Sequence, residues 1–367
     1  MKVFKRIYQW LPAKKLIFSG LRLIWKPSRS IYQHLHFTGI FSVPVRGTKR
    51  RFQVQHYGYQ IENSIFWQGL EGGHEGTTLK LWSILCKNSK TILDIGASTG
   101  IFSLVAKTVA PDSKVYAFEP VERVFDKLKV NCDLNQFEVS LIKKAASNFD
   151  GLAKIYDLET EHIYSVTVNK DLGPEGYTRR IVEIPTVTLK TFIEEEKLSE
   201  IDLIKIDVET HEVEVIQGMA EYLSKMRPTL FIEVLTQEVA EGLRTLFENL
   251  GYVFFDIDES GAIQALPQIE RSTHYNLLVC QPQVAKDLSL HLLQGIQRGK
   301  TDVVTSSRIF ELEDHGAGLA LENFKFEEFV LDDYALVSDD RNIEGSQPPI
   351  LQKERVSPDD RHIPAQH

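Results

Sequence analysis

The sequence predicts an α/β fold with a doubly wound, mostly parallel sheet of seven strands, a β-rich insert and an antiparallel hairpin at one edge. Two patterns predict it. Apolar runs of strand length alternate with amphipathic helical runs between residues 91 and 251, which is typical of parallel strands joined by crossover helices. The last two strand-like runs have no helix between them, so we expect them to pair in antiparallel fashion.

The predicted elements follow one another in a regular order. The seven strands are TILDIG (91–96), KVYAFEP (114–120), VSLIKKA (139–145), IDLIKIDV (201–208), TLFIEVL (229–235), YVFFDI (252–257) and HYNLLVC (274–280). Helices are expected where apolar residues recur three and four positions apart, over 75–88, 101–110, 121–135, 189–198, 213–225 and 238–251. The strand candidates GLAKIYDL, IYSVTVN and RRIVEIPTVTL form the predicted insert, from about 151 to 188.

The composition, 43% hydrophobic and 25% charged, is that of an ordinary globular protein. We divide the 367 residues into a basic N-terminal segment with short strands (1–60), the main domain (61–283), an accessory C-terminal extension (284–337) and a polar tail (338–367). The tail has too few apolar residues to form a core, so we expect it to be disordered.

Cysteine usage and the apolar runs indicate the compartment. Cys86, Cys132 and Cys280 are far apart and form no Cys-x-x-Cys pair, which argues against a disulfide framework or a cysteine-built zinc site. No signal peptide is evident, and no apolar run reaches the roughly 20 residues that a spanning helix needs. We therefore expect a cytoplasmic protein.

Charge is distributed unevenly along the chain. Residues 1–61 contain twelve Lys and Arg and no acidic residue, whereas the remainder contains 30 basic and 51 acidic residues. A basic arm on an acidic body suggests an anionic partner such as a membrane surface or nucleic acid, although a solvated basic face gives the same pattern. Residues 13–26 can form an amphipathic helix with Phe18 and Trp25 on one side. Such a helix lies either on an anionic bilayer as a peripheral contact or on the protein's own body.

Carboxylates and glycines stand where the predicted parallel strands end, which is the edge at which open α/β sheets bind ligands. The first strand ends in Asp94 and Gly96, and the chain reaches Gly100 before the next helix. Glycines permit a tight turn and close approach of the backbone to a ligand. The second strand ends in Glu119, where a carboxylate can accept both hydroxyls of a ribose. These residues predict an adenosine-type cofactor.

The glycine spacing distinguishes between such cofactors. A dinucleotide fold has Gly-x-Gly-x-x-Gly, whereas this chain has Gly-x-x-x-Gly with Asp94 two residues before the first glycine. A carboxylate in that place suits an amino group better than a pyrophosphate. S-adenosyl-L-methionine has an amino group and a sulfonium and no phosphate, so we predict it as the cofactor.

Five segments within residues 60–282 resemble, in order and spacing, the FkbM family of S-adenosylmethionine-dependent methyltransferases. They are LDIGASTGIFSLVA, VYAFEP, AASNFDG, TVTLKTF and IDLIKIDVETHEVEVIQGM. The resemblance implies the Rossmann-like, seven-stranded methyltransferase sheet. It also implies O-methylation of a hydroxyl on a sugar, a glycolipid or a secondary metabolite. Two residues depart from the family pattern, because Thr210 stands where glycine is usual and Ser98 where asparagine is common.

The resemblance further implies which residues hold the cofactor. Asp94, Gly96 and Gly100 would hold its methionine part. Glu119 would hold the ribose, and Glu75 would lie near the amino group. The predicted cofactor-binding set is completed by Ser98, Pro120 and Ser147.

An alcohol acceptor benefits from a base within hydrogen-bond reach. Asp207 and His211 are the candidates from the fourth-strand motif, although Asp207 could equally cap the next helix and His211 could face solvent. His162, in the insert, is either a further candidate or an ordinary loop residue. We predict no metal site, because a strand-to-helix turn would not direct Asp207, Glu209 and Glu212 at one ion.

Other functions stay open at this point. They are methyl transfer to nucleic acid or protein, an NAD-dependent oxidoreductase, and a non-catalytic binding module. The glycine spacing argues against the oxidoreductase, and the intact set of cofactor residues argues against the binding module. The sequence contains no Asn/Asp-Pro-Pro-Tyr motif of the kind that binds a nucleic-acid base. We expect the partner to be a hydroxylated small molecule or glycan, and the oligomeric state is left open.

Overall fold

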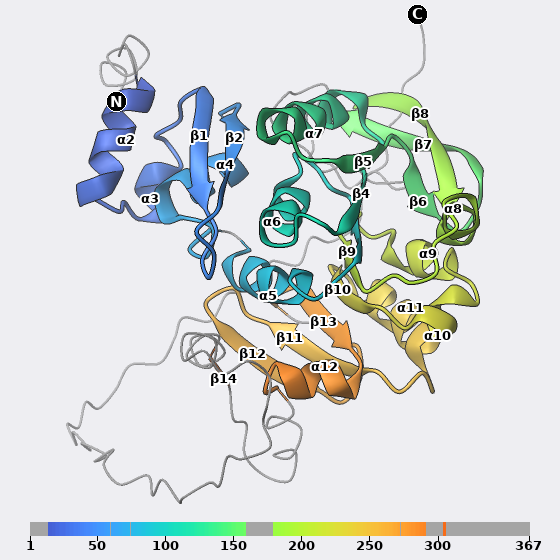
Figure 1. The fold of residues 1–367 in the computed structure, drawn as a ribbon. Coiled ribbons are helices and arrows are strands. Elements are labelled where there is room, and N and C mark those ends of the chain that lie inside the picture. Colours follow the sequence, from blue (N-terminus) through green and yellow to red (C-terminus); the bar gives the residue numbers. More distant parts are fainter. Residues whose placement is uncertain are drawn as a thin grey trace, which may run out of the picture. The chain divides into compact units, whose positions relative to one another are not determined.

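The computed structural model of the chain describes residues 14–58, 60–73, 75–158, 179–271, 273–290 and 304–305. Its largest sheet has the strand order β14-β12-β11-β13-β10-β9-β3-β4-β5 (Figure 1). The strands are β3 (Thr91–Ile95), β4 (Lys114–Phe118), β5 (Val139–Ile142), β9 (Leu203–Ile206), β10 (Thr229–Glu233), β11 (Val253–Ile257), β12 (Ala262–Leu266), β13 (Asn276–Cys280) and β14 (Val304–Thr305). The seven predicted strands are all present in this sheet.

Five neighbouring strands, β5, β4, β3, β9 and β10, are parallel. Successive residues of these strands point to opposite faces, and each face belongs to its own buried cluster. Ile92 and Leu203 lie in one cluster, and Leu93 and Ile204 lie in the other. The sheet is therefore covered on both faces, as predicted for a doubly wound fold. The strand order reverses between β3 and β9, and that is where ligands bind in such sheets.

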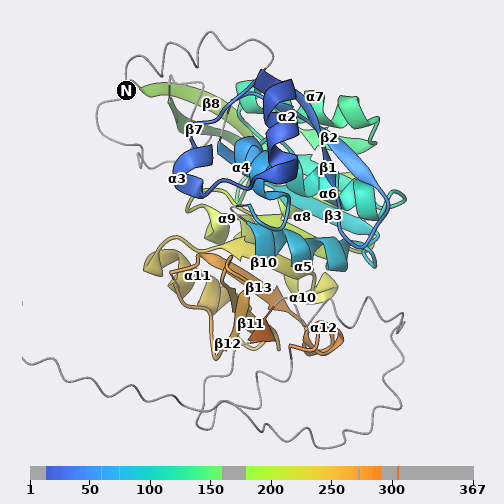
Figure 2. The ribbon, with the colours of Figure 1, turned by 90° about the vertical axis from the view of Figure 1, so that its left-hand side faces the viewer.

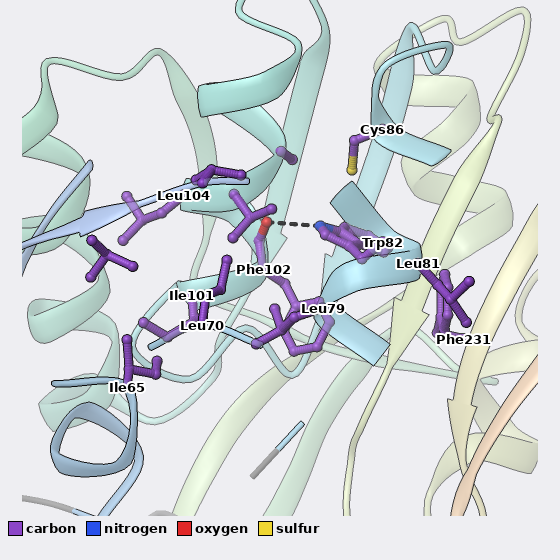
Figure 3. Packing of buried hydrophobic residues seen from close by; sticks show 14 of the residues in the cluster. Ile65, Leu70, Leu79, Leu81, Trp82, Cys86, Ile101, Phe102, Leu104 and Phe231 are labelled. Atoms are coloured by element: carbon purple, nitrogen blue, oxygen red, sulfur yellow. Dashed lines mark hydrogen bonds between the residues drawn. The ribbon is translucent and has the colours of Figure 1, made fainter. Parts of the chain in front are cut away.

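Helices cover the two faces. One face carries α5 (Gly76–Cys86), α6 (Ile101–Val109) and α7 (Glu122–Asn135), and the other carries α8 (Leu189–Glu195), α9 (Glu212–Gln217), α10 (Tyr222–Met226) and α11 (Gln237–Phe247). Trp82 of α5 packs against α6 and β10. The centroid of its ring lies 5.4 Å from that of Phe102 and 5.8 Å from that of Phe231. Its indole N–H also donates to the Phe102 carbonyl oxygen at 2.9 Å (Figure 3). The helix predicted over 213–225 is divided in two, because Ala220 has a φ of 48°.

The antiparallel part of the sheet is larger than predicted. β11 and β13 pair as expected, with Phe255 opposite Leu278. However, β13 lies between β10 and β11, and β12 and β14 lie beyond β11. Contrary to the prediction, the pair of β11 and β13 therefore does not form the edge of the sheet, and the sheet has nine strands. Strand β12 is absent from the predicted strands because its apolar alternation is short. The turn at Gly261, with a φ of 115°, returns this segment along β11.

The predicted insert forms a second sheet with the residues before it. Strands β6 (Ala145–Ser147), β7 (Gly151–Leu158) and β8 (Arg179–Thr188) have the order β6-β8-β7. β7 and β8 are antiparallel, which confirms two of the three strand candidates. The third candidate, 163–169, and His162 lie outside the described residues.

The N-terminal segment packs against α6 and α7, two of the helices that cover the main sheet. It consists of α2 (Lys14–Ile24), α3 (Arg29–Tyr32), the hairpin of β1 (Gly39–Pro44) and β2 (Arg51–His56), and α4 (Gln60–Gln68). The backbone N–H of Gln55 in β2 donates to Asn131 of α7 at 2.9 Å. The rings of Phe18 and Trp25 lie 5.4 and 6.2 Å from Trp67 of α4. Of the two alternatives for residues 13–26, packing on the protein's own body is therefore observed.

The C-terminal part is described only at its beginning. Helix α12 (Pro282–Asp287) follows β13, and the tail predicted from residue 338 lies outside the described residues. None of the helices in the described ranges is long and apolar enough to cross a bilayer. Cys86, Cys132 and Cys280 are buried as free thiols. The boundaries at residues 60 and 283 stay predictions.

Candidate active site

The glycine turn after β3 brings several strand ends together. Gly96 has a φ of 79°, and a Cβ atom there would lie 1.8 Å from the carbonyl oxygen of Asp207 at the end of β9. Gly100 has a φ of 91°, and a Cβ atom there would lie 2.5 Å from Cδ1 of Leu128 in α7. The N–H of Gly96 donates to the carbonyl oxygen of Phe118 at the end of β4, at 3.0 Å. Both glycines are therefore required by close packing of the turn against its neighbours.

Asp94 is buried and its carboxylate is directed at α6. Its Oδ2 accepts hydrogen bonds from the backbone N–H and the hydroxyl of Ser103, at 2.9 and 2.6 Å. Burial raises the pKa of Asp94 to about 6, and the bonds from Ser103 and the charge of Lys205 oppose this rise. Asp94 therefore fixes the first turn of α6 to β3, and its contact with a cofactor stays a prediction.

Glu119 joins the end of β4 to the glycine turn. Its Oε2 accepts from the N–H of Ser98 and its Oε1 from the N–H of Val121, both at 3.0 Å. Burial raises the pKa of Glu119 to about 7, against the effect of these two bonds and of Arg123. Each carboxylate oxygen can accept a second hydrogen bond. The hydroxyl of Ser98 is buried and has no hydrogen-bond partner among the described residues, and Pro120 follows Glu119 directly.

A buried lysine, which sequence analysis did not single out, lies at the end of β9. The Nζ of Lys205 lies 2.9 Å from Oδ2 of Asp207, 3.6 Å from Oε1 of Glu75 and 4.6 Å from the ring centroid of Phe102. Burial alone would lower the pKa of Lys205, but Asp207 and Glu75 outweigh it and raise this pKa above its usual value. The ammonium group therefore stays charged. The available signal was one charged residue inside the apolar strand LIKI.

Carboxyl groups surround this lysine. Burial raises the pKa of Glu75 to about 7, and the charge of Lys205 opposes the rise. Burial and then the neighbouring Asp207 raise the pKa of Glu233, at the end of β10, to about 10. A hydrogen bond with Asp207 contributes to this rise, so Glu233 is protonated at neutral pH. We call Glu75, Lys205, Asp207 and Glu233 the lysine–carboxylate cluster.

Two predicted residues contact each other away from this lysine. Ser147 at the end of β6 and His211 before α9 are buried, and Ser147 Oγ lies 3.0 Å from His211 Nε2. His211 Nδ1 lies 3.5 Å from Oε2 of Glu214. Burial lowers the pKa of His211. The solvent-facing alternative for His211 is therefore wrong, and both ring nitrogens have neighbours other than Asp207.

The turn after β9 has an unfavourable backbone. Glu209 and Thr210 have φ values of 54° and 78°, in the left-handed region that β-branched residues rarely adopt. Oε1 of Glu212 accepts hydrogen bonds from the N–H groups of Val208 and Thr210, both at 3.2 Å. The Glu212 carboxylate thus stabilises the turn between β9 and α9. Within the described parts of the chain, no three His, Cys, Asp or Glu side chains are grouped so as to hold a metal ion.

A cavity of about 680 Å³ lies at the same edge of the sheet, on the side of β10 and β13. Asn276 joins this cavity to the lysine–carboxylate cluster. It lies opposite Glu233 where β13 pairs with β10, and its side-chain amide donates to Oε1 of Glu259 at 3.1 Å. Glu259 lines the cavity and also accepts from the N–H of Thr77 at 2.8 Å. The cavity is therefore connected to α5 and to the strand ends.

Polar groups line this cavity. The hydroxyl of Ser64 is buried and has no hydrogen-bond partner in the part of the chain that the structure describes. Nδ1 of His274 lies 2.7 Å from Oδ2 of Asp256, and this hydrogen bond raises the pKa of His274. Lys26 and Arg29 supply positive charge from the N-terminal segment. His274 is not among the predicted site residues, because its only signal in the sequence is its place at the start of the last predicted strand.

The site residues fit the predicted cofactor. Glu119 offers acceptors for two ribose hydroxyls, and the buried Ser98 hydroxyl offers a group for a ligand. The carboxyl groups of Glu75 and Asp94 have pKa values raised by burial. A ligand with an amino group and a sulfonium would supply the positive charge that buried carboxylates require. The predicted residues next to the glycine turn are Asp94, Gly96, Ser98, Gly100, Glu119 and Pro120.

Comparisons with known proteins identify the class to which the chain belongs. A sequence model of the Methyltransferase FkbM domain matches residues 94–254. The chain is 30% identical over 187 residues to the 2-O-methyltransferase NoeI of Sinorhizobium fredii, covering 46% of this chain and 74% of NoeI. It is 28% identical over 210 residues to methyltransferase sdnD of Sordaria araneosa, covering 50% and 80%. It is 26% identical over 182 residues to the hexuronic acid methyltransferase AglP of Haloferax volcanii, covering 50% and 69%.

A solved structure is also similar. The methyltransferase FkbM from Methylobacillus flagellatus superposes with a TM-score of 0.34 and 14% identity, covering 52% of this chain and 43% of that chain. From the fold, the site and the family match together, this chain is an S-adenosylmethionine-dependent methyltransferase. Within that class it belongs to the FkbM family, as its sequence motifs predicted. Its cofactor is S-adenosyl-L-methionine.

Proposed function

We propose that the chain transfers the methyl group of S-adenosylmethionine to a hydroxyl of a sugar or another hydroxylated small molecule. Two of the similar proteins support this acceptor class, because one is named a 2-O-methyltransferase and another a hexuronic acid methyltransferase. The observation that carries the proposal is the position of the Asp207 carboxyl group, 2.9 Å from the buried ammonium group of Lys205 at the edge of the sheet.

The cofactor supplies a methyl group on a positively charged sulfur, which makes that carbon open to attack by an oxygen. The residues of the chain act on the acceptor. An alcohol oxygen becomes a better nucleophile when a base accepts its proton, and Asp207 is the proposed base. As the acceptor oxygen took the methyl group, the carbon–sulfur bond would break and its electron pair would stay on the sulfur, while the proton of the acceptor hydroxyl would pass to the Asp207 carboxylate. Lys205 and Glu233 fix the position of Asp207 beforehand.

The cavity beside the cluster is the proposed acceptor site. Its polar lining suits a molecule with many hydroxyls, and the unpartnered Ser64 hydroxyl can bond to one of them. Lys26 and Arg29 can pair with a carboxylate or another anionic group of the acceptor. Because Asp258 and Glu259 also line the cavity, the lining carries both signs of charge, and a sugar with many hydroxyls fits it better than an apolar alcohol does.

The substitution Asp207→Asn tests the proposed base. Methyl transfer from labelled cofactor is measured against neutral sugars, uronic acids and lipid-linked glycans, and an accepted acceptor is then used for kinetics. We expect kcat to fall by about 10²- to 10⁴-fold, because the amide cannot accept the proton. The affinity for S-adenosylhomocysteine, measured by calorimetry, should stay the same. Asp287→Asn, in α12, is the matched control and should leave kcat unchanged.

Two results would count against the proposal. If a chain that binds S-adenosylhomocysteine methylates none of these acceptors, the acceptor class is wrong. If Asp207→Asn retains the kcat of the parent chain, another group accepts the proton. His274 would be tested next, since it lines the cavity and bonds to Asp256.

A further inference from the structure

Helix α2 exposes a continuous aliphatic face. Leu16, Ile17, Leu23 and Ile24 are 72%, 40%, 81% and 85% exposed, whereas Phe18 is only 4% exposed. At 3.6 residues per turn, these four side chains fall on the side of the helix opposite Phe18. A surface helix normally turns polar residues outward. In Figure 1 this helix stands at the outer side of the N-terminal elements, and in Figure 2 it faces the viewer.

The apolar surface continues into the next turn of the chain. Trp25 and Ile31 are 41% and 44% exposed. Of the eleven large hydrophobic side chains that are exposed among the described residues, six lie between residues 16 and 31. Scattered exposed hydrophobic residues need no explanation, but a gathered patch marks a contact surface. We call the six exposed residues the α2 face: Leu16, Ile17, Leu23, Ile24, Trp25 and Ile31.

Basic residues flank the α2 face. Lys14 and Lys15 precede it, and Lys26 and Arg29 lie within it along the chain. The chain has no acidic residue before Glu62. Aliphatic side chains flanked by Lys and Arg are typical of helices that lie in the interface of an anionic bilayer. A second copy of the chain is a poor occupant, because the two basic segments would repel each other.

We propose that the α2 face binds the surface of an anionic lipid bilayer. The helix lies parallel to that surface, with its aliphatic side chains at the level of the lipid headgroups and acyl chains. The flanking basic groups pair with lipid phosphates. The excess of acidic residues after residue 61 keeps the rest of the chain away from the same surface and so orients the molecule.

This placement has a consequence for the acceptor. The proposed acceptor cavity is lined by Lys26, Pro27, Ser28 and Arg29, which lie between Trp25 and Ile31 of the α2 face along the chain. A bound chain would therefore hold one wall of that cavity next to the bilayer, where an acceptor carried on a lipid would be found. The consequence rests on the proposed function. Vesicle binding itself is measured without methyl transfer, so the failure of either proposal is distinguishable from failure of the other.

The test is cosedimentation of the full chain with vesicles. Vesicles of phosphatidylcholine alone are compared with vesicles that also contain phosphatidylglycerol, at low and at high salt. We expect binding to the anionic vesicles only, weakened by salt. The variant Leu23→Ser/Ile24→Ser should reduce the partition coefficient by at least about tenfold, because it removes two large aliphatic side chains from the contact. The control Leu152→Ser/Ile181→Ser changes residues of the insert that are 65% and 58% exposed, and it should bind as the parent chain does.

Each other outcome overturns the proposal. Absence of binding to anionic vesicles would show that the α2 face is covered by something else. Equal binding by the parent chain and the Leu23→Ser/Ile24→Ser variant would place the lipid contact elsewhere. A dimer in solution that this variant converts to a monomer, without vesicle binding by the parent chain, would assign the face to self-association. Calorimetric titration with S-adenosylhomocysteine shows that each variant is folded.

Discussion

Thr210 occupies a backbone conformation that suits glycine. Its φ of 78° lies in the left-handed region, and a non-glycine residue held there costs on the order of 1–3 kcal/mol. Glycine adopts this conformation freely but loses more conformational entropy on folding. This geometry gives a physical reason for the glycine that is usual at this position in the FkbM pattern. The strain at Thr210 is a property of one residue and can be tested by itself.

We expect Thr210→Gly to raise the free energy of unfolding by about 1 kcal/mol, since relief of strain exceeds the entropic cost of glycine. Urea denaturation followed by circular dichroism measures the change. Thr245→Gly, in the interior of α11, is the matched control and should lower the free energy of unfolding by about 0.5–1 kcal/mol. Equal destabilisation by the two substitutions would show that the Thr210 backbone is not strained.

Glu62 in α4 is a second residue whose placement costs free energy of folding, and the candidate active site gives no reason for this cost. It is fully buried, and neither carboxylate oxygen has a hydrogen-bond partner within the described ranges. Burial raises its pKa from 4.5 to about 7, and Lys127 opposes the rise only in part. The folded chain therefore holds a proton on Glu62 at pH values where the unfolded chain has lost it. Stability that depends on this proton is present below pH 4.5 and is lost as the pH rises through 7.

We expect Glu62→Gln to be more stable than the parent chain at pH 8 by about 3–3.5 kcal/mol, because the pKa of Glu62 rises from 4.5 to about 7 and one pKa unit corresponds to about 1.4 kcal/mol. The difference should shrink towards zero at pH 5, where Glu62 is largely protonated in the folded chain. Thermal and urea unfolding across this pH range measure it. Glu195→Gln, at the exposed end of α8, is the control. A stability difference that does not change with pH would contradict the assignment.

At the scale of elements, the turn between β3 and α6 depends on how tightly neighbouring elements approach it. At Gly96 the neighbour is the backbone carbonyl of Asp207 in the adjacent strand end, which cannot move without shifting β9. At Gly100 the neighbour is the end of the Leu128 side chain, which can rotate. Both positions have positive φ, so only the neighbour distinguishes them.

We therefore expect Gly96→Ala to be much more harmful than Gly100→Ala. Gly100→Ala should lower the free energy of unfolding by about 1–3 kcal/mol, mainly through its backbone conformation. Gly96→Ala should cost more than about 4 kcal/mol, and any folded fraction should fail to bind S-adenosylhomocysteine, because the ends of β3 and β9 move apart. Thermal unfolding and calorimetry measure both effects. Similar losses for the two variants would show that the approach of β9 is not limiting.

At the scale of the whole molecule, the N-terminal segment and the sheet form one packed body. Phe18 of α2 and Ile92 of β3 belong to the same buried hydrophobic cluster. The basic segment is therefore held in a defined place on an acidic chain of net charge −9. It also supplies Lys26 and Arg29 to the cavity on the side of β10 and β13. Basic charge, exposed apolar surface and the proposed acceptor cavity are thus connected through one segment.

The sequence by itself determined the class of the fold and the cofactor edge. Alternating strand and helix patterns depend on local periodicity, so the strands and the helices around them could be predicted from short windows. The glycine turn and Glu119 could be predicted because they follow directly on recognisable strands. The family motifs identified the chain as a methyltransferase of the FkbM family for the same reason.

Only the tertiary structure decided how distant segments meet. Lys205, Glu75 and Asp207 come into contact because α5 packs beside the end of β9. The placement of β13 between β10 and β11 brings Asn276 next to Glu233, and this links the cavity to the cluster. The burial of His211 against Ser147 likewise depends on where β6 lies. Such contacts join residues far apart in sequence, and no local pattern records which strand becomes the neighbour of which.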